Sequence, residues 1–389
     1  MDRARYLEPS VRQDLAEKMV FIAGARQVGK TTLARRIMAT STSSAYYNWD
    51  NRADRAEIRA ARWPAGKALV VLDELHKWRA WKGWLKGEYD QHRERLRFLV
   101  TGSARLDIYR RGGDSLQGRY HHYRLHPFSV GEMTAPVTLP APGAEIEVPA
   151  RVRRETLEAL VQFGGFPEPL LAGSTRTLRR WQRERFERFF REDVRDLESI
   201  RDLASLQLLA DLLPERISAP LSLNALREDL EVSHRALTNW MEIFERLYYV
   251  FRLRPFTSTR VRALQKMPKA YLWDWSVVPS DGARFENLVA SHLLKLCHLL
   301  HDRDGHDVDL HYLRDRTGRE VDFLVTAGRK PWFAVEAKLS ETRVDPALPY
   351  FRDRLRIPWV YQVVRDARRD VIDSGVRVVP AERFLAALP

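Results

Sequence analysis

The chain of 389 residues is 44% hydrophobic and 30% charged, which is typical of a water-soluble globular protein with two or three domains. No apolar run approaches the roughly 18 residues of a membrane-spanning helix, so we expect no membrane association. The single cysteine, Cys297, excludes an internal disulfide and a thiolate zinc cluster and favours a cytoplasmic location. The formal net charge of +13 favours an anionic partner such as nucleic acid, although arginine scattered along the whole chain would give the same total.

A phosphate-binding loop is predicted near the N-terminus. After a short lead-in helix within residues 1–18, an apolar strand from Met19 runs into Gly24-x-x-x-x-Gly29-Lys30-Thr31, and a helical pattern follows. Glycines let backbone N–H groups approach a phosphate, and the positive end of the following helix favours an anion. A glycine turn with a chance lysine is the alternative. The predicted nucleotide-binding residues are Gly24, Ala25, Arg26, Gln27, Val28, Gly29, Lys30, Thr31, Thr32 and Asp73.

Two carboxylates end a later buried strand. A short strand is expected at 45–48, and the apolar run at 68–73 ends in Asp73 and Glu74. Parallel strands carry functional groups at their C-terminal ends. We therefore expect Lys30 to contact the β- and γ-phosphates, Thr31 and Asp73 to hold Mg²⁺, and Glu74 to polarise the attacking water. Acidic residues that merely end a strand are the alternative.

The next predicted strand, at 97–104, has a polar tip with Thr101 and Ser103. These hydroxyls would lie near the γ-phosphate if the strand lies between the first strand and the acidic one; otherwise Thr-Gly-Ser is only a turn. Before this strand, Trp78, Trp81 and Trp84 recur at helical spacing, which favours a core or interface over a base-stacking platform.

Strands alternate with helices up to a strand at 121–125, which predicts a doubly wound α/β domain. A proline-rich loop follows at 134–150, and the pattern then becomes helical, with a turn at 164–169. The mixed charges between Arg179 and Arg201 are typical of a solvated helix face.

A winged helix is predicted next. Residues 221–247 indicate a short helix, a turn and a longer helix that Ser233 would cap, and an apolar strand follows at 248–253. Winged helices bind DNA or other proteins. Because Glu242 and Glu245 on the longer helix weaken phosphate binding there, both kinds of partner stay open.

Several of these motifs together resemble the prokaryotic AAA+-superfamily ATPases that carry a winged helix and a C-terminal domain of unknown function. The residues that carry the resemblance are the loop at 25–32, Leu-Asp-Glu-Leu-His-Lys at 72–77, Thr-Gly-Ser at 101–103, Gly118-Arg119, Pro-Phe-Ser at 127–129 and Gly-Gly-Phe-Pro at 164–167. The resemblance implies an ATPase core at 1–148, a helical lid at 149–215, a winged helix at 216–262 and a further α/β domain at 263–389.

The resemblance also implies ATP and Mg²⁺ as cofactors and an ATP-dependent homo-oligomer. In such assemblies an arginine of the neighbouring subunit often completes the site. Arg119 is the candidate for this role, with Arg105 as the second choice, and a solvated surface arginine is the alternative for either.

A separate group of polar residues lies in the last third of the chain. Glu286 begins a long amphipathic helix, and Asp322, Glu336 and Lys338 lie on predicted neighbouring strands. This pattern resembles the restriction-endonuclease-like fold, in which carboxylates bind Mg²⁺ or Mn²⁺ and the lysine helps to position water. The alternatives are an ion-paired sheet surface or an inactive relative.

Two functional hypotheses follow. In the first, ATP binding and hydrolysis act on nucleic acid, with DNA favoured over RNA, and the C-terminal domain is a possible metal-dependent nuclease. In the second, ATP controls a protein-interaction surface and the nuclease-like domain is an inactive scaffold.

Overall fold

The computed structural model describes residues 3–102, 116–134, 138–194, 202–257, 267–340 and 343–389. The chain divides into two compact units. The first comprises Met1–His126 with Arg246–Tyr248, and the second comprises Pro127–Glu245 with Tyr249–Pro389. Within the described ranges, none of the helices is long and apolar enough to cross a membrane.

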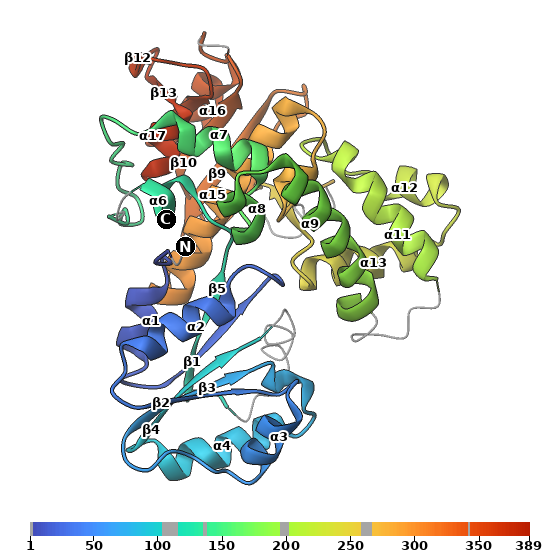
Figure 1. The fold of residues 1–389 in the computed structure, drawn as a ribbon. Coiled ribbons are helices and arrows are strands. Elements are labelled where there is room, and N and C mark those ends of the chain that lie inside the picture. The colour runs from blue at the N-terminus through green and yellow to red at the C-terminus, as the bar shows by residue number, and fades with distance from the viewer. Residues whose placement is uncertain (1–2, 103–115, 135–137, 195–201, 258–266, 341–342) are drawn as a thin grey trace. The chain divides into compact units, whose positions relative to one another are not determined.

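The first unit contains a five-stranded parallel sheet, which fits the α/β core expected from the sequence (Figure 1). Its order is β2-β3-β4-β1-β5, so β4 lies between the first strand and the acidic strand, as the predicted role of Thr101 requires. The strands are β1 (Met19–Gly24), β2 (Ser44–Asn48), β3 (Ala68–Asp73), β4 (Leu96–Thr101) and β5 (Tyr120–Leu125).

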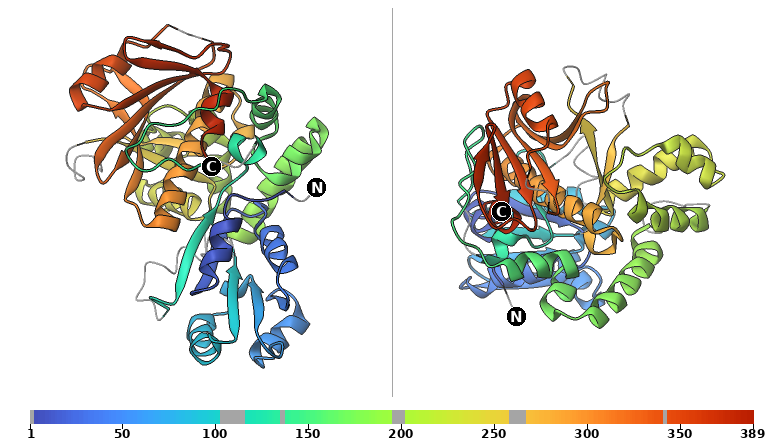
Figure 2. Two further views of the ribbon diagram at one scale, coloured as in Figure 1. Left: turned by 90° about the vertical axis from the view of Figure 1, so that its left-hand side faces the viewer. Right: turned by 90° about the horizontal axis from the view of Figure 1, so that it is seen from above.

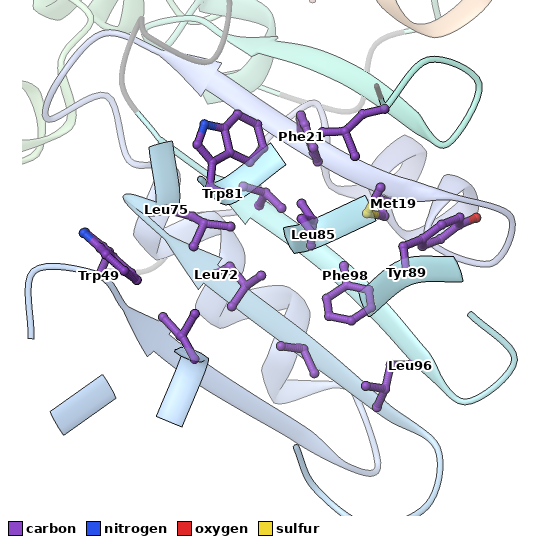
Figure 3. Packing of buried hydrophobic residues seen from close by; sticks show 14 of the residues in the cluster. Met19, Phe21, Trp49, Leu72, Leu75, Trp81, Leu85, Tyr89, Leu96 and Phe98 are labelled. Carbon is purple, nitrogen blue, oxygen red and sulfur yellow. The ribbon is translucent and has the colours of Figure 1, made fainter. Parts of the chain in front are cut away.

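Helices pack on both faces of this sheet and bury its inner strands β1 and β3 on both sides. The helices are α1 (Glu8–Asp14), α2 (Lys30–Ala39), α3 (Arg52–Arg59) and α4 (Trp81–His92), with a 3₁₀ turn, η1, at Leu75–Lys77. Figure 3 shows Trp81, Leu85 and Tyr89 of α4 packed on the apolar side chains of the strands. Trp78 stacks on Trp49 with ring centroids 4.9 Å apart, so these tryptophans belong to the core rather than to a base-stacking surface.

The second unit begins with helices, as the sequence pattern predicts. Ser174, Ser222 and Ser233 each accept a backbone N–H at a helix start, which satisfies donors that the helix itself leaves open. The segments are α6 (Val130–Thr134), α7 (Arg154–Phe163), α8 (Pro167–Ala172), α9 (Thr175–Arg188), a π-helical turn, η3, at Phe189–Val194, α11 (Leu203–Leu212), η4 (Leu213–Arg216), α12 (Leu223–Asp229) and α13 (His234–Arg246).

The predicted turn at Gly164-Gly165 is a close-packing point of this unit. The Phe128 N–H donates to the Gly165 carbonyl at 2.7 Å. A Cβ atom at Gly165 would lie 2.6 Å from the Trp275 ring and 2.8 Å from Pro127. Only glycine therefore lets the segment after residue 126 pass so close to the helices.

An eight-stranded mixed sheet follows, with the order β12-β13-β11-β10-β9-β8-β6-β7. Helix α15 (Asp281–Asp304) contacts β7, β8, β9 and β10, and Figure 2 shows it beside these strands. The remaining elements are β6 (Val250–Pro255), β7 (Lys269–Leu272), η5 (Trp275–Val277), β8 (Val308–Arg314), β9 (Glu320–Ala327), β10 (Lys330–Lys338), α16 (Ala347–Leu355), β11 (Trp359–Val364), β12 (Val371–Asp373), β13 (Val376–Pro380) and α17 (Ala381–Ala386).

Strand β6 differs from the expected wing of a winged helix. The strand forms, but it pairs antiparallel with β7 and parallel with β8, so it is part of the C-terminal sheet. The predicted domain boundary between residues 262 and 263 thus separates two strands that pair with each other. The division of the chain into four domains otherwise stays a prediction.

Candidate functional sites

The phosphate-binding loop joins the end of β1 to the start of α2. Gly24 has φ 156° and Gly29 has φ 101°, and a Cβ atom on Gly24 would lie 2.6 Å from the Leu125 carbonyl oxygen. Gln27, between them, has φ 64°, which is uncommon for a residue with a side chain. The sequence therefore forms a tightly turned loop at a helix N-terminus, which is the backbone that phosphate binding needs.

Lys30 is the first residue of α2 and is largely buried in this loop. Its Nζ donates to the carbonyl oxygens of Gly24 at 3.0 Å and Ala25 at 2.9 Å. The ammonium group is thus held at the loop where the phosphates are expected. Thr32, two residues further along the helix, is exposed.

Asp73 is the central acceptor of the site, and it is buried at the end of β3. Thr31 Oγ1 donates to Asp73 Oδ2 at 2.8 Å, and the Thr101 hydroxyl donates to Oδ1 at 2.5 Å. The strand register places Thr101 directly beside Asp73, since the two are paired residues of β4 and β3. The structure therefore brings together three of the residues predicted for magnesium and phosphate binding.

Tyr46 is a member of this group that the sequence did not predict. Its hydroxyl donates to Asp73 Oδ2 at 2.6 Å from β2. Burial, together with the neighbouring Asp73 carboxylate, raises the pKa of Tyr46 above its usual range, so the phenol stays a donor at neutral pH. No motif spacing marks this tyrosine, because the contact depends on β2 lying next to β3.

Glu74 follows Asp73 with φ 57°, and its N–H donates to the Thr101 carbonyl at 2.9 Å. Burial raises the pKa of Glu74, while the positive charges of Lys30 and Lys77 oppose the rise. A carboxylate with a raised pKa that is influenced by the charge of the loop lysine has the properties of a general base or water-orienting group.

The loop lysine, the hydroxyl of Thr31 and the buried carboxylate of Asp73 fit a nucleotide with Mg²⁺. A hard cation prefers oxygen ligands of this kind, and an anion prefers the helix N-terminus with its lysine. Lys30, Thr31 and Asp73 are therefore the residues that suit a nucleotide with Mg²⁺, and Thr101 and Glu74 lie beside Asp73.

The predicted trans arginine lies elsewhere in the first unit. Arg119 Nε and Nη2 donate to the two carboxylate oxygens of Asp90 at 2.7 and 3.0 Å. Arg119 precedes β5, and its carbonyl accepts the Met19 N–H at the start of β1. The phosphate-binding loop is at the other end of β1, roughly 16 Å away at about 3.3 Å per residue, so Arg119 does not reach its own site. Ser103 and Arg105 lie outside the described residues.

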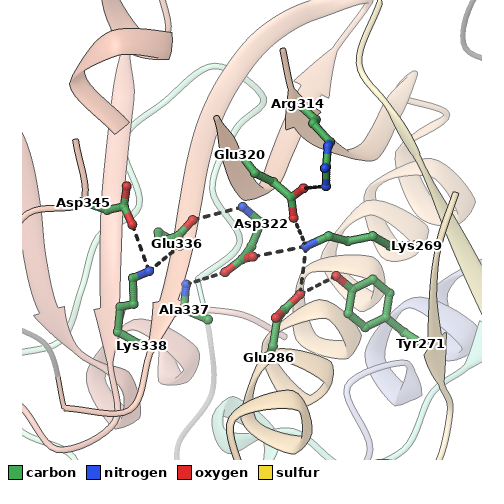
Figure 4. A network of polar contacts seen from close by, with 10 residues as sticks. All are labelled: Lys269, Tyr271, Glu286, Arg314, Glu320, Asp322, Glu336, Ala337, Lys338 and Asp345. Atoms are coloured by element: carbon green, nitrogen blue, oxygen red, sulfur yellow. Dashed lines mark hydrogen bonds and ion pairs between the residues drawn. The ribbon is translucent and has the colours of Figure 1, made fainter. Parts of the chain in front are cut away.

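The polar residues of the C-terminal unit also lie together, but around a lysine (Figure 4). Lys269 Nζ lies 3.3 Å from Glu286 Oε1, 2.6 Å from Glu320 Oε1 and 3.3 Å from Asp322 Oδ1. Tyr271 donates to Glu286 Oε1 at 2.7 Å.

Glu336 and Lys338 form the other half of this centre. Glu336 Oε2 accepts the Asp322 N–H at 3.1 Å, and Lys338 Nζ lies 2.8 Å from Glu336 Oε1 and 2.9 Å from Asp345 Oδ2. Burial, with the nearby Asp322 charge, raises the pKa of Glu286 to about 7 and that of Glu336 to about 8.

The predicted metal ligands Glu286, Asp322 and Glu336 therefore lie close together, but they do not fit a metal ion. Across the ranges that the structure describes, no group of three or more His, Cys, Asp or Glu side chains is arranged to hold one. The sequence analysis missed Lys269 and Glu320. Strand alternation could have found Glu320, which shares a face with Asp322, whereas no local signal marks Lys269.

Comparisons with protein families divide the chain into three parts. Residues 16–134 match the family described as AAA domain. Residues 154–280 match a domain of unknown function (DUF8612), and residues 281–384 match another (DUF4143).

Relatives among curated proteins are distant. The chain is 22% identical over 296 residues to the uncharacterised protein MJ1544 of Methanocaldococcus jannaschii. This match covers 74% of this chain and 65% of that protein. It is 21% identical over 295 residues to an uncharacterised protein of Mycobacterium tuberculosis, covering 72% and 62% of the two chains. The chain thus spans slightly less than two thirds of these relatives.

Among solved structures, the Orc1 protein of Aeropyrum pernix in complex with DNA is matched with 15% identity and a TM-score of 0.35, over 75% of this chain and 95% of that chain. RuvB of Thermotoga maritima is matched with 15% identity and a TM-score of 0.30, over 63% and 87%. The family match and the geometry of the glycine-rich loop agree: residues 16–134 of this chain carry an AAA domain with a P-loop, and the two regions that follow match domains of unknown function.

Proposed function

We propose that the protein is a Mg²⁺-dependent ATP hydrolase. The observation that carries this proposal is the buried Asp73, which accepts the hydroxyls of Thr31 and Thr101 beside the loop that holds Lys30. An isolated glycine-rich turn would not require a buried carboxylate with these donors.

The proposed roles follow from the charges and positions of the side chains. Lys30 releases the loop carbonyls and binds the phosphates, and Thr31 with Asp73 holds Mg²⁺, which neutralises phosphate charge when it is bound. Glu74 orients and polarises the attacking water. Thr101 keeps the Asp73 carboxylate in place through its hydroxyl.

The test is steady-state ATP turnover with purified full-length protein. Lys30→Ala should abolish nucleotide binding or turnover, and Glu74→Gln should still bind ATP but hydrolyse it poorly. Lys67→Ala, which removes an exposed lysine of the same unit, is the matched control and should turn over normally. Full turnover in Lys30→Ala or Glu74→Gln contradicts the assignment.

We propose nucleic acid, with DNA favoured, as the partner on which the ATPase acts. Helix α9 supports this, because four arginines at helical spacing share an exposed face: Arg176, Arg179, Arg180 and Arg183. Such a face suits a phosphate backbone. Helix α13 is less suited, since its polar face carries Glu242 and Glu245, the latter ion-paired with Arg252.

DNA binding measured over a range of salt concentrations tests this partner. Arg179→Gln with Arg183→Gln should weaken binding and lower the slope of log K against log salt by roughly 0.9 for each phosphate that is no longer neutralised. Arg316→Gln with Arg354→Gln removes the same charge from exposed positions elsewhere and should change binding less. Equal weakening by the two double variants would mean that α9 is not the interface.

Stimulation of ATP turnover by DNA distinguishes the proposal from an ATP-controlled protein-interaction switch. A protein that hydrolyses ATP at the same rate with and without DNA supports the switch.

Because Lys269 lies among the carboxylates of the C-terminal unit, we propose a scaffold role for that unit and derive no metal-dependent cleavage from it.

A further inference from the structure

Lys269 is one of the most deeply buried lysines among the described residues, with 1% of its surface exposed. Its ammonium group lies within 3.3 Å of oxygens from Glu286, Glu320 and Asp322. Glu286 comes from α15, 17 residues further along the chain, and Asp322 comes from β9, 53 residues further along. The ammonium group therefore takes the place that a shared cation would take.

The backbone holds this lysine firmly. Lys269 begins β7, pairs with Leu253 of β6 and forms a bridge with Pro220. The Tyr312 ring lies 5.7 Å from the ammonium nitrogen on another side. Strand pairing at Lys269 thus fixes the direction from which its side chain enters the acidic group.

Contacts within the protein already use both carboxylate oxygens of Asp322 and both of Glu336. Asp322 Oδ1 accepts Lys269 and Oδ2 accepts the Ala337 N–H at 3.1 Å. Glu336 Oε1 contacts Lys338, and Oε2 accepts the Asp322 N–H. A divalent ion would require these oxygens at about 2.0–2.6 Å, with several further oxygen ligands, in the volume that the ammonium group fills.

We propose that Lys269 is a built-in monovalent counter-ion that occupies the cation position of this acidic centre and keeps divalent metal out. Ejecting the ammonium group would leave a buried charge without its partners, which is unfavourable unless the site reorganises. Removing that ammonium group while keeping the carboxylates uncovers a site for Mn²⁺ or Mg²⁺, because hard divalent ions prefer carboxylate oxygens.

The test is Mn²⁺ binding to full-length protein without nucleotide, measured by electron paramagnetic resonance of free Mn²⁺. Lys269→Met removes the ammonium group and its charge and keeps an unbranched side chain that is one atom shorter. Lys330→Met, at an exposed position on β10, is the control for the change in net charge. The double variant Lys269→Met with Asp322→Asn tests whether any new site uses the carboxylate.

We expect wild-type protein, Lys330→Met and Asp322→Asn to bind Mn²⁺ equally weakly. Lys269→Met should gain one Mn²⁺ site that binds at least tenfold more tightly than the wild-type protein does. The double variant should lose this site. Mn²⁺ should also raise the Tm of Lys269→Met more than that of the wild type. Wild-type binding that is lost in Asp322→Asn overturns the proposal, as does a folded Lys269→Met protein that gains no site. If Lys269→Met does not fold, the comparison of wild type with Asp322→Asn still decides.

Discussion

Thr101→Val isolates one hydrogen bond at the nucleotide site. Valine keeps the shape of the buried side chain, so the change leaves no sizeable cavity, and it removes the hydroxyl that donates to Asp73 Oδ1 at 2.5 Å. Thr31 and Tyr46 donate to Oδ2 and are unaffected, so the change falls on a single oxygen. A hydrogen bond to a charged group contributes about 1.5–3 kcal/mol, and the free energy of unfolding should fall by about that amount.

Urea unfolding followed by tryptophan fluorescence measures this change, since Trp49 and Trp81 belong to the core of the same unit. The Asp73→Asn background supplies the control, because it keeps a side chain of the same shape and removes the charge. Thr101→Val should cost at least about 0.5 kcal/mol less in that background. An equal cost in both backgrounds, or a cost below about 0.5 kcal/mol in the wild type, would refute the role of a charge-assisted bond.

Three further predictions concern other parts of the chain. If Arg119 acts on a neighbouring subunit, Arg119→Ala should lower ATP turnover by several orders of magnitude. Asp90→Ala breaks the same ion pair and should leave turnover largely intact. Equal turnover rates in both variants across protein concentration would make Arg119 a surface residue. Burial raises the pKa of Glu336 from 4.5 to about 8, so the folded state favours the protonated form of this side chain. The protonated side chain therefore contributes to the free energy of unfolding; this contribution is complete below about pH 4.5 and is lost as the pH rises through about 8. Glu336→Gln should flatten that pH dependence in urea unfolding, and an unchanged profile would contradict the assignment. Gly165→Ala should lower the Tm of the protein measurably, since the added Cβ would lie 2.6 Å from the Trp275 ring, and an unchanged Tm would show that the turn can open without cost.

The amino-acid sequence alone determined the parts of this protein whose chemistry is local. The phosphate-binding loop needs glycines, a lysine and a hydroxyl at fixed spacing between a strand and a helix, and a short stretch of chain contains all of them. Asp73 and Glu74 could be recognised because a buried strand ends there. The capping role of Ser233 was predictable for the same reason, since a cap acts within a few residues.

The tertiary structure decided what depends on neighbours that are distant in the sequence. Tyr46 reaches Asp73 only because β2 lies beside β3, and β6 joins the C-terminal sheet because it pairs with β7 and β8. The carboxylates of Glu286, Asp322 and Glu336 indicated a metal site, since spacing reveals which acids share a face but not which cation lies between them. Lys269 lies between Glu286 and Asp322, and Lys338 lies beside Glu336; strand pairing rather than any motif brings Lys269 there.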